Sequence, residues 1–405
     1  MLTSQNQVFR EALILKESLI QLRRELHQYP ELSFQEYKTS SVVKRELERI
    51  PGMKVYAGLE HTGLSTGVVG ELAFGDDGPV IALRADMDAL PIEEENEEDY
   101  RSKQPGVMHA CGHDAHTTIV LGAARILAEK VKPAFAGTIK FIFQPAEEDT
   151  DEQGVTGSPY MISHGVLDNV DVALALHMDP EYPVGHVRLH EGPSMANVDT
   201  FTGSIHGTGG HGAYPHLGTD PTWMLSFILQ SIHGISARKV SPLEPAVISV
   251  CHIEGGSSTN VIPSKVLLEG TMRSYTKETR KELEEELHQA FAVAQSLGGS
   301  YELEVKKGEP ALNNSSKAIN LVRETIGEFF PEMVIHDKPY GLGGEDFGYM
   351  AEKVPAAMFF LGAGKDDRKD RGLHMPCFDI NEEALPVGAS ILAGSVLKFM
   401  SDPQL

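Results

Sequence analysis

Cysteine and positive charge are scarce in this sequence, and each shortage excludes a class of protein. The 405 residues include three cysteines, Cys111, Cys251 and Cys377, which lie too far apart to form the disulfide framework of a small secreted domain. Lys and Arg total 35 against 58 Asp and Glu, and the formal net charge of −23 repels a phosphate backbone. We therefore expect a reducing compartment and no nucleic-acid partner.

Long apolar runs are also missing. We identify no uninterrupted apolar stretch of the roughly 18 residues that a membrane helix needs, so no membrane partner is expected. The first seven residues, MLTSQNQ, lack the basic start and apolar core of a secretory signal. Hydrophobic residues make up 41% of the chain and charged residues 23%, which is typical of a globular protein with a large core. These features predict a cytoplasmic protein.

The first half of the chain alternates apolar strands with helical stretches. Residues 13–30 have helical spacing and stop at Pro30, and a second helix is expected over 115–130, where Asp114 could cap it. Three apolar runs are typical of buried strands that lead into polar loops: 79–88, 137–148 and 171–180. Strand, helix, strand in this order predicts an α/β fold with a mostly parallel sheet covered by helices.

From about residue 194 the pattern changes to that of a smaller domain. Its runs follow one another as βαββαβ, the order of a ferredoxin-like fold: 197–207, 220–236, 246–256, 265–275, 277–298 and 300–308. Beyond them, a helix, a strand and a closing helix resume the first pattern: 316–330, 356–364 and 385–400. We therefore predict one α/β domain formed by residues 1–193 and 306–405, interrupted by an inserted domain at 194–305.

Polar side chains follow the strands of the predicted parallel sheet. They are carboxylates and imidazoles: Asp86 and Asp88 after the first strand, Glu147 and Glu148 after the second, His177 at the end of the third, and His374 a short loop beyond the last. Ligands of open α/β sheets bind outside the carboxyl ends of the strands, so we expect these groups to converge.

The stretch MHACGHDAH, residues 108–116, adds a thiol and further imidazoles. Thiolate, imidazole and carboxylate together suit zinc, and the carboxylates also admit manganese. Cys111 and His113 do not share a helix face, so they would chelate from a turn that Gly112 permits. A redox pair is excluded because no second cysteine is near. His116, one helical turn from His113, is either a residue that supports the ligands or an ordinary helix-face residue.

Glu147 and Glu148 are adjacent, so their side chains point in different directions. One can bind a metal while the other faces the substrate, and two such neighbours tend to separate in pKa, which leaves the free one able to shuttle protons. The apolar strand 141–143 leads directly into the pair, which makes two merely exposed acids the weaker alternative.

Seven motifs resemble the amidohydrolase branch of the metallopeptidases that includes aminoacylase and carboxypeptidase G. The hippurate, N-acyl-amino-acid and indoleacetyl-amino-acid hydrolases are the most similar members. The resemblance spans about residues 20–400, and the motifs keep the family's order: ELHQYPELSFQEYKTS, ALRADMDALPI, GVMHACGHDAH, FIFQPAEE, HGTGGHGAYPH, GGEDFG and LHMPCFDI.

This resemblance implies a site for two divalent metal ions per subunit, zinc or manganese. The positions that match the family's ligands are Cys111, His113, Glu148, His177 and His374. Glu147 matches the general base, which takes a proton from a metal-bridging water and passes it to the leaving nitrogen. Asp86, where the peptidase branches carry a ligand histidine, is expected to orient ligands together with Asp88 and His116.

The resemblance also makes the inserted domain a lid and a dimerisation module, so a homodimer or higher homo-oligomer is expected. His211 matches the lid histidine that stabilises the tetrahedral oxyanion, in some relatives from the partner subunit. Asn260 and Arg273 match positions that hold the substrate carboxylate, a task that suits a guanidinium. From the sequence alone, Arg273 fits a surface strand equally well.

The implied function is metal-dependent hydrolysis of the amide bond of N-acyl L-amino acids, with a dipeptidase or aminopeptidase acting on short peptides as the alternative. A cysteine hydrolase that uses Cys111, and a binding protein without turnover, are rival hypotheses; the match of five ligands and Glu147 argues against the latter. Residues 207–212, GTGGHG, also satisfy a dinucleotide fingerprint. Pro215 follows at once and the next helix is expected only at 220–221, so we predict a loop there.

Overall fold

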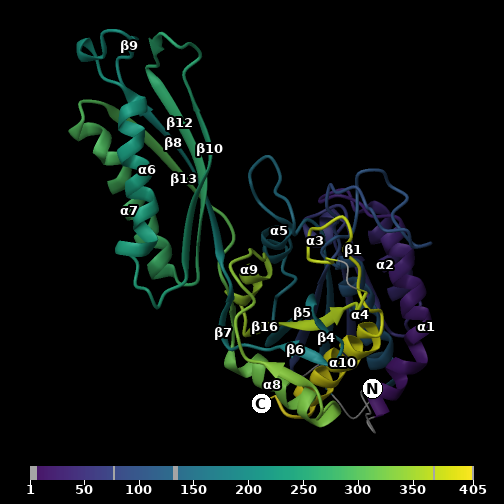
Figure 1. Cartoon of the computed structure of the whole chain (residues 1–405). Helices are drawn as coiled ribbons and strands as arrows, with labels where there is room; N and C mark the ends of the chain where they lie inside the picture. Colours follow the sequence, from purple (N-terminus) through teal and green to yellow (C-terminus); the bar gives the residue numbers. More distant parts are fainter. Residues whose placement is uncertain (1–6, 76–77, 131–135, 368–369, 404–405) are drawn as a thin grey trace. The chain divides into compact units, whose positions relative to one another are not determined.

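The computed structural model describes residues 7–75, 78–130, 136–367 and 370–403 (Figure 1). The chain divides into two compact units. The first contains Met1–Gly192, Asn313–Tyr340 and Asp346–Leu405, and the second contains Pro193–Leu312 and Gly341–Glu345. The boundary predicted from the sequence lies earlier, at 306. The sequence also does not assign Gly341–Glu345 to the second unit, because these five residues form no helix or strand with a recognisable periodicity.

Within the described residues, the first unit is built on an eight-stranded sheet in the order β1-β2-β4-β3-β5-β16-β6-β15. The strands are β1 (Lys54–Ala57), β2 (Val68–Phe74), β3 (Val80–Asp86), β4 (Gly137–Gln144), β5 (Val172–Pro183), β6 (His186–Arg188), β15 (Val334–His336) and β16 (Ala356–Gly364). The central strands β4, β3, β5 and β16 are parallel to their neighbours in that group, whereas β1, β2 and β6 introduce antiparallel pairs. The predicted mostly parallel sheet is confirmed.

Helices of the first unit pack against this sheet. They are α1 (Gln7–Gln28), α2 (Tyr37–Glu48), α3 (Leu59–Thr62), α4 (His113–Lys130), α5 (Gly157–Ser163), α8 (Ser316–Phe329), α9 (Phe347–Ala351) and α10 (Ala384–Ser401). α1, α4 and α10 contact one another and enclose the largest apolar core, while α5 and α9 contact each other beside β4, β5 and β16. This core holds the strand ends that carry the polar residues at fixed positions.

α10 is the one described helix that is long and apolar enough to cross a membrane, a feature that the sequence analysis did not single out. Of its most apolar window, 83% is buried against the rest of the protein. Small residues permit close packing: a Cβ on Gly394 would lie 2.3 Å from Phe329 Cε2 of α8. Burial of this kind is what a core helix of a large α/β unit requires.

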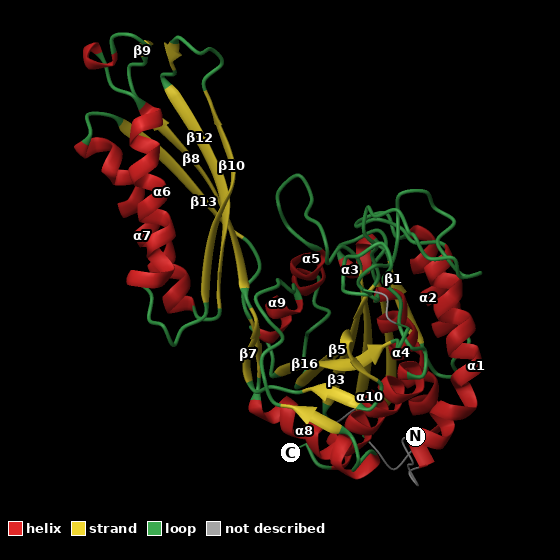
Figure 2. Cartoon of the chain, in the orientation of Figure 1, coloured by secondary structure: helices red, strands yellow, loops and turns green. Residues whose placement is uncertain are grey.

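The second unit contains a four-stranded antiparallel sheet in the order β10-β12-β8-β13. Its main elements follow as βαββαβ: β8 (Asn197–His206), α6 (Pro221–Arg238), β10 (Ala246–Gly255), β12 (Lys265–Ser274), α7 (Lys277–Ser296) and β13 (Ser300–Lys307). α6 and α7 lie side by side on one face of the sheet (Figure 2). Asp220 caps α6 by accepting from the amide of Thr222, so the helix begins at Pro221.

Short elements complete the fold. They are β7 (Gly192–Met195), β9 (Gly210–His211), η1 (Pro215–Leu217), β11 (Val261–Ile262) and β14 (Leu312–Asn314). β9 and β11 pair with each other at one end of the second unit, so that His211 lies opposite Val261. This small ribbon places His211 near Asn260, which directly precedes β11.

Candidate functional site

Side chains predicted as metal ligands lie together at one edge of the sheet in the first unit. The Cys111 thiol lies 3.3 Å from His177 Nε2, and His374 Nε2 lies 3.2 Å from a Glu148 oxygen. His113 Nε2 lies 3.7 Å from the same Glu148 oxygen. Two groups of three donors, each within 4.8 Å of one another, share Cys111: Cys111, His113 and His177, and Cys111, Glu148 and His374. All five predicted ligands therefore converge.

These residues fit divalent metal ions. His113 Nε2 and Glu148 Oε1 are buried atoms that form no hydrogen bond of acceptable geometry within the described part of the chain. Buried polar atoms without partners are rare and need an explanation, and a cation between them would supply one. The donors are a thiol, three imidazoles and a carboxylate, a set that suits zinc and related ions.

The backbone conformation at Gly112 determines the directions of the Cys111 and His113 side chains. Gly112 has φ of 93°, a left-handed conformation that lets Cys111 and His113 bracket a sharp turn, as the sequence analysis expects. α4 begins at His113, and Asp114 lies inside the first turn rather than before the helix. The Asp114 carboxylate accepts from the amide of Ala115, but it also binds Arg23 and His27, so its role is wider than that of a cap.

His177 lies within β5 rather than at its end, which corrects the expectation from the sequence. β5 runs on to Pro183 because β16 stays paired with it beyond His177, with an irregularity at Gly362 and Gly364. The ring Nδ1 of His177 donates to the carbonyl of Met178 over 2.8 Å. This hydrogen bond leaves Nε2 unprotonated and directed toward Cys111, which is the form a metal ligand needs.

His116 and the two aspartates surround the ligands. His116 Nδ1 donates to Asp86 over 2.7 Å, and His116 Nε2 accepts from the amide of Met178 over 2.8 Å, so neither nitrogen is available to a cation. One Asp88 oxygen lies 3.2 Å from His113 Nδ1, and the other accepts from the amide of Glu148. Asp88 therefore fixes the His113 ring and the backbone of Glu148, and His116 holds the backbone beside His177.

Arg84 binds Asp86, which supports the site, and was not predicted from the sequence. Its guanidinium is buried and binds Asp86 over 2.6 Å, Asp346 over 2.8 Å and Gln144 over 3.1 Å. A buried cation in the apolar run VIALRAD needs acidic partners, and Asp86, two residues along the strand, is on the same face. The Arg84-x-Asp86 spacing indicates this ion pair in the local sequence. Asp346 lies 262 residues away, so the sequence alone does not indicate it as a partner.

The electrostatic environment of Cys111 argues against a cysteine hydrolase. Burial and then the carboxylates of Glu148 and Glu147 raise the pKa of the Cys111 thiol well above its usual range. A nucleophilic cysteine needs a lowered pKa, so Cys111 without a cation is a poor nucleophile. Burial lowers the pKa of His113, but Asp86 and Asp88 outweigh it and raise that pKa to about 10. Neighbouring carboxylates contribute to both shifts, and divalent cations would neutralise their negative charge.

Glu147 lies beside the ligands with part of its carboxylate exposed. Its Oε2 lies 3.8 Å from His113 Nε2, and 10% of its side chain is accessible. The residue follows Ala146, which has the left-handed φ of 54°. His374 also has a left-handed φ, 60°, and its amide donates to the carbonyl of Ala110. Strained residues of this kind cluster at functional sites because surrounding contacts must hold them.

A buried charge network lies beside the site and was not predicted. Arg23 of α1 pairs with Asp114 over 2.8 Å and with Asp379 over 3.1 Å, and His27 lies 2.7 Å from Asp114. His109, for which the sequence offered no role, is buried, and neither ring nitrogen has a partner within the described residues. Burial lowers the pKa of His109 to about 4, so the ring is neutral at physiological pH.

In the second unit His211 and Asn260 are exposed, as His374 is in the first unit, and Arg273 is half-buried. His211 Nδ1 accepts from the amide of Ala213, which leaves Nε2–H as a donor, and the Asn260 side-chain oxygen accepts from Ser258. His211 and Asn260 are neighbours because the amide of Gly212 donates to the Asn260 carbonyl. The β12 residue nearest to both in sequence is Lys265, at the start of that strand. Arg273 lies eight residues further along β12, about 26 Å from Lys265.

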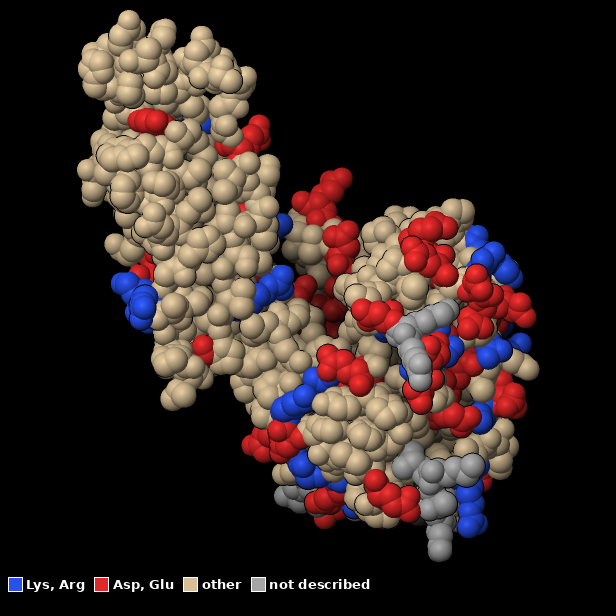
Figure 3. Space-filling view, in the orientation of Figure 1, with Lys and Arg blue, Asp and Glu red and all other residues tan. Residues whose placement is uncertain are grey.

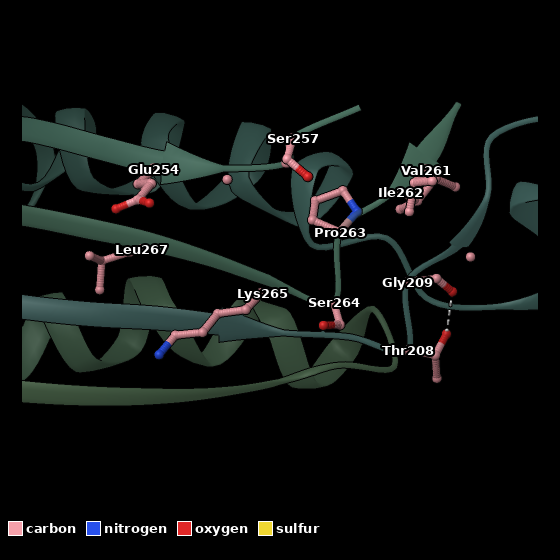
Figure 4. A pocket seen from close by; sticks show the side chains of 13 residues that line it. Thr208, Gly209, Glu254, Ser257, Val261, Ile262, Pro263, Ser264, Lys265 and Leu267 are labelled. Carbon is pink, nitrogen blue, oxygen red and sulfur yellow. Dashed lines mark hydrogen bonds between the residues drawn. The ribbon is translucent and has the colours of Figure 1, made fainter. Parts of the chain in front are cut away.

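Thr208, Gly209 and Gly210 of the dinucleotide-like stretch line a pocket of about 750 Å³ in the second unit (Figure 4). No helix opens at Gly212, since α6 begins at Pro221. The amides of Gly207, Thr208 and Gly209 already donate to Ser264 and Thr219. A phosphate cradle needs free amides, so this loop does not form one.

Fold and site together define a metal-binding hydrolase. Residues 82–398 match the family described as Peptidase family M20/M25/M40. The chain belongs to this peptidase family, as the resemblance of its motifs indicated. Hydrolysis of amide bonds, predicted from the motifs, is thereby confirmed.

Known proteins resemble the chain over nearly its whole length. N-acetyl-L-cysteine deacetylase of Bacillus subtilis is 39% identical over 375 residues, which cover 92% of this chain and 85% of that relative. Thermostable carboxypeptidase 1 of Saccharolobus solfataricus is 38% identical over 392 residues, which cover 95% and 96%. The crystal structure of a dinuclear metal binding peptidase of the M20 family from Bacillus subtilis has a TM-score of 0.83 at 33% identity and covers 96% and 99%.

Proposed function

We propose that this protein is a metal-dependent deacylase, which hydrolyses N-acyl L-amino acids, such as N-acetyl amino acids, to a carboxylic acid and a free amino acid. The observation that carries the proposal is the position of Glu147, partly exposed and 3.8 Å from His113 Nε2 beside the donor groups. The 39% identity to N-acetyl-L-cysteine deacetylase supports the substrate class.

The five donor side chains would hold two divalent cations, zinc or manganese: Cys111, His113, Glu148, His177 and His374. When bound, such cations polarise an amide carbonyl and lower the pKa of water. Glu147 then acts as the general base, which takes a proton from the attacking water and delivers it to the leaving nitrogen. Asp86, Asp88 and His116 orient the ligands through the hydrogen bonds described above.

The second unit is proposed to be a lid that contacts the substrate and a second copy of the chain. His211, with Nε2–H free to donate, suits stabilisation of an oxyanion, and Asn260 and Arg273 suit recognition of a carboxylate. Asn260 precedes β11, near the Lys265 end of β12, whereas Arg273 lies near the other end of β12, too far away to bind the same carboxylate within one chain. We therefore propose a homodimer or higher homo-oligomer, in which one copy supplies His211 and Asn260 to the other.

A substrate panel tests the function directly. Metal-reconstituted protein is incubated with N-acetyl and longer N-acyl amino acids and with dipeptides, and release of free amine is measured. The proposal expects turnover of N-acyl amino acids to exceed that of dipeptides in kcat/KM by at least tenfold. Hydrolysis confined to dipeptides would contradict it.

A peptidase acting on short peptides is the second candidate. It is favoured by the 38% identity to a protein named thermostable carboxypeptidase 1, which covers 95% of this chain. The same ligands and base would serve both reactions, because each cleaves an amide beside a carboxylate.

We also propose that the protein works in the cytoplasm. Its three cysteines are free thiols, and Cys251 is exposed, a state that a reducing compartment maintains.

A further inference from the structure

The turn that carries the proposed base and ligand depends on residues far away in the sequence. Pro145–Glu148 follows β4, and Ala146 within it has φ of 54°, a conformation that a residue with a Cβ rarely adopts. Its carbonyl accepts from the amide of Gly157 over 2.7 Å. Its amide donates over 2.9 Å to the carboxylate of Glu36, 110 residues earlier in the chain.

Glu36 lies in the motif ELHQYPELSFQEYKTS, to which the function so far assigns no role. The side chain is completely buried. Its Oε1 accepts from the amides of Ala146 and Phe34, both over 2.9 Å, and its Oε2 accepts from the Thr66 hydroxyl over 2.8 Å. Phe34 has φ of 65°, so one carboxylate oxygen holds the amides of two left-handed residues.

An ordinary structural explanation for Glu36 would be helix capping. Glu36 stands at the N-cap of α2, but its side chain makes no capping hydrogen bond to that helix. Its two carboxylate oxygens accept instead from the amides of Ala146 and Phe34 and from the Thr66 hydroxyl.

The other side of the turn is held in the same way. The amide of Glu148 donates to Asp88 Oδ2 over 2.9 Å, and the same oxygen accepts from Ser33. The amides of Ala146 and Glu148, the residues on either side of Glu147, therefore both donate to buried carboxylates. The position of Glu147, whose Oε2 lies 3.8 Å from His113 Nε2, therefore depends on this turn.

We propose that Glu36 is a positioning residue of the active site, which holds the Pro145–Glu148 turn so that Glu147 and Glu148 keep their separate directions. The proposal rests on the proposed function for the roles of those two glutamates. Glu36 acts through the acceptor position of its side-chain oxygens and not through its charge. Burial, with Asp88 nearby, raises the pKa of Glu36 to about 7, which agrees with a role that does not require full ionisation.

Two substitutions separate these possibilities. Glu36→Gln keeps an oxygen for both amides and can donate to Thr66, so kcat should stay within threefold of wild type. Glu36→Ala removes the acceptors, and kcat should fall at least tenfold while KM changes less than twofold. If Glu36→Ala does not fold, Glu36→Asp replaces it, because it keeps the charge but withdraws the oxygens by one methylene.

Hydrogen exchange gives a reading that needs no substrate. In Glu36→Ala the amides of the peptide that contains Ala146 should exchange at least tenfold faster than in wild type, and in Glu36→Gln they should not. The matched control is Glu46→Ala on α2, which removes a buried carboxylate bound to Arg45, Arg49 and Arg125. This control should change neither kcat nor exchange at Ala146.

Three results would overturn the proposal: unchanged exchange at Ala146 in Glu36→Ala, equal losses of kcat in Glu36→Gln and Glu36→Ala, or an equal loss in Glu46→Ala. A failure of the proposed function is distinguishable. In that case the exchange difference would appear as expected, but no N-acyl amino acid would be hydrolysed.

Discussion

The candidate residues of the two units differ in how firmly the fold holds them. In the first unit, Arg84, Asp86 and His116 are at most 1% exposed, and each has named partners for its polar atoms. In the second unit, His211 and Asn260 are exposed, and His211 keeps a donor free. The surface differs as well: on the face seen in Figure 3, charged residues are dense on the first unit and sparse on the second.

This difference separates residues whose role is set by the fold from residues whose role requires another molecule. Buried atoms of the first unit need a cation or a partner to be satisfied, so their chemistry can be derived from one chain. Exposed polar atoms of the second unit are already solvated, so their role depends on contact with a substrate or with a second copy of the chain. Substitutions should therefore act more strongly in the first unit than in the second.

The largest effect is expected at the ligand shared by both donor groups. Cys111→Ala should lower kcat/KM on an N-acetyl amino acid on the order of a thousandfold, since metal ions contribute several kcal/mol of transition-state stabilisation. Bound metal, measured on the purified protein, should fall as well. Cys377→Ala, at a half-buried cysteine, is the control and should behave as wild type. Full metal content in an inactive Cys111→Ala would favour the cysteine hydrolase instead.

A smaller loss is expected at the base. Glu147→Gln should lower kcat about a few hundredfold, which is within the contribution of a positioned general base, while metal content stays at the wild-type level. Glu152→Gln, at an exposed carboxylate in the following loop, should leave kcat unchanged. If Glu147→Gln retained the wild-type rate with metal bound, the assigned base would be wrong.

The second unit should show a more moderate effect. His211→Ala should lower kcat roughly tenfold to a hundredfold, in line with the loss of one donor to an oxyanion. His216→Ala removes another exposed histidine of the same loop and should have no effect. A loss at His211 as large as that at Glu147 would remove the contrast between the two units.

The smallest effect concerns stability and not turnover. Burial raises the pKa of Asp379, but Arg23 and Lys365 outweigh it and lower that pKa to about 2. A carboxyl whose pKa is lower in the folded state stabilises the protein above the ordinary value near 4, and this contribution of about 2 kcal/mol is lost as the pH falls toward 2.

Asp379→Asn should therefore flatten the decline in the free energy of unfolding between pH 4 and pH 2, as measured with urea. Asp149→Asn, at an exposed aspartate, should leave the decline as in wild type. An equally steep decline in Asp379→Asn would show that other groups set the acid sensitivity.

Sequence patterns predicted long elements better than short ones. The run 356–364 is β16 to the residue, and the expected helix at 220–236 is α6 with two further residues. Short β6 and β15 were not predicted, because three residues are too few for a periodicity. β5 extends past His177 because its partner β16 continues, and a partner strand is not visible in local sequence.

The site shows the same limit. The donor residues were identified because their chemistry and family motifs are local in the sequence, as in CGH at 111–113. Arg84 with Asp346, and Glu36 with Ala146, join segments 262 and 110 residues apart. Contacts of this kind arise from the fold, so a single sequence reveals at most one partner of each pair.

The central claim is that two divalent cations at one edge of the first unit make this protein a hydrolase of N-acyl amino acids. Its most direct test is to strip the protein with chelator, add back zinc or manganese in steps, and follow bound metal and amine release from an N-acetyl amino acid together. The account predicts no hydrolysis by the stripped protein and full activity when two equivalents per chain are bound. Full activity in metal-free protein, or saturation of binding at no more than one equivalent with full activity, would contradict it.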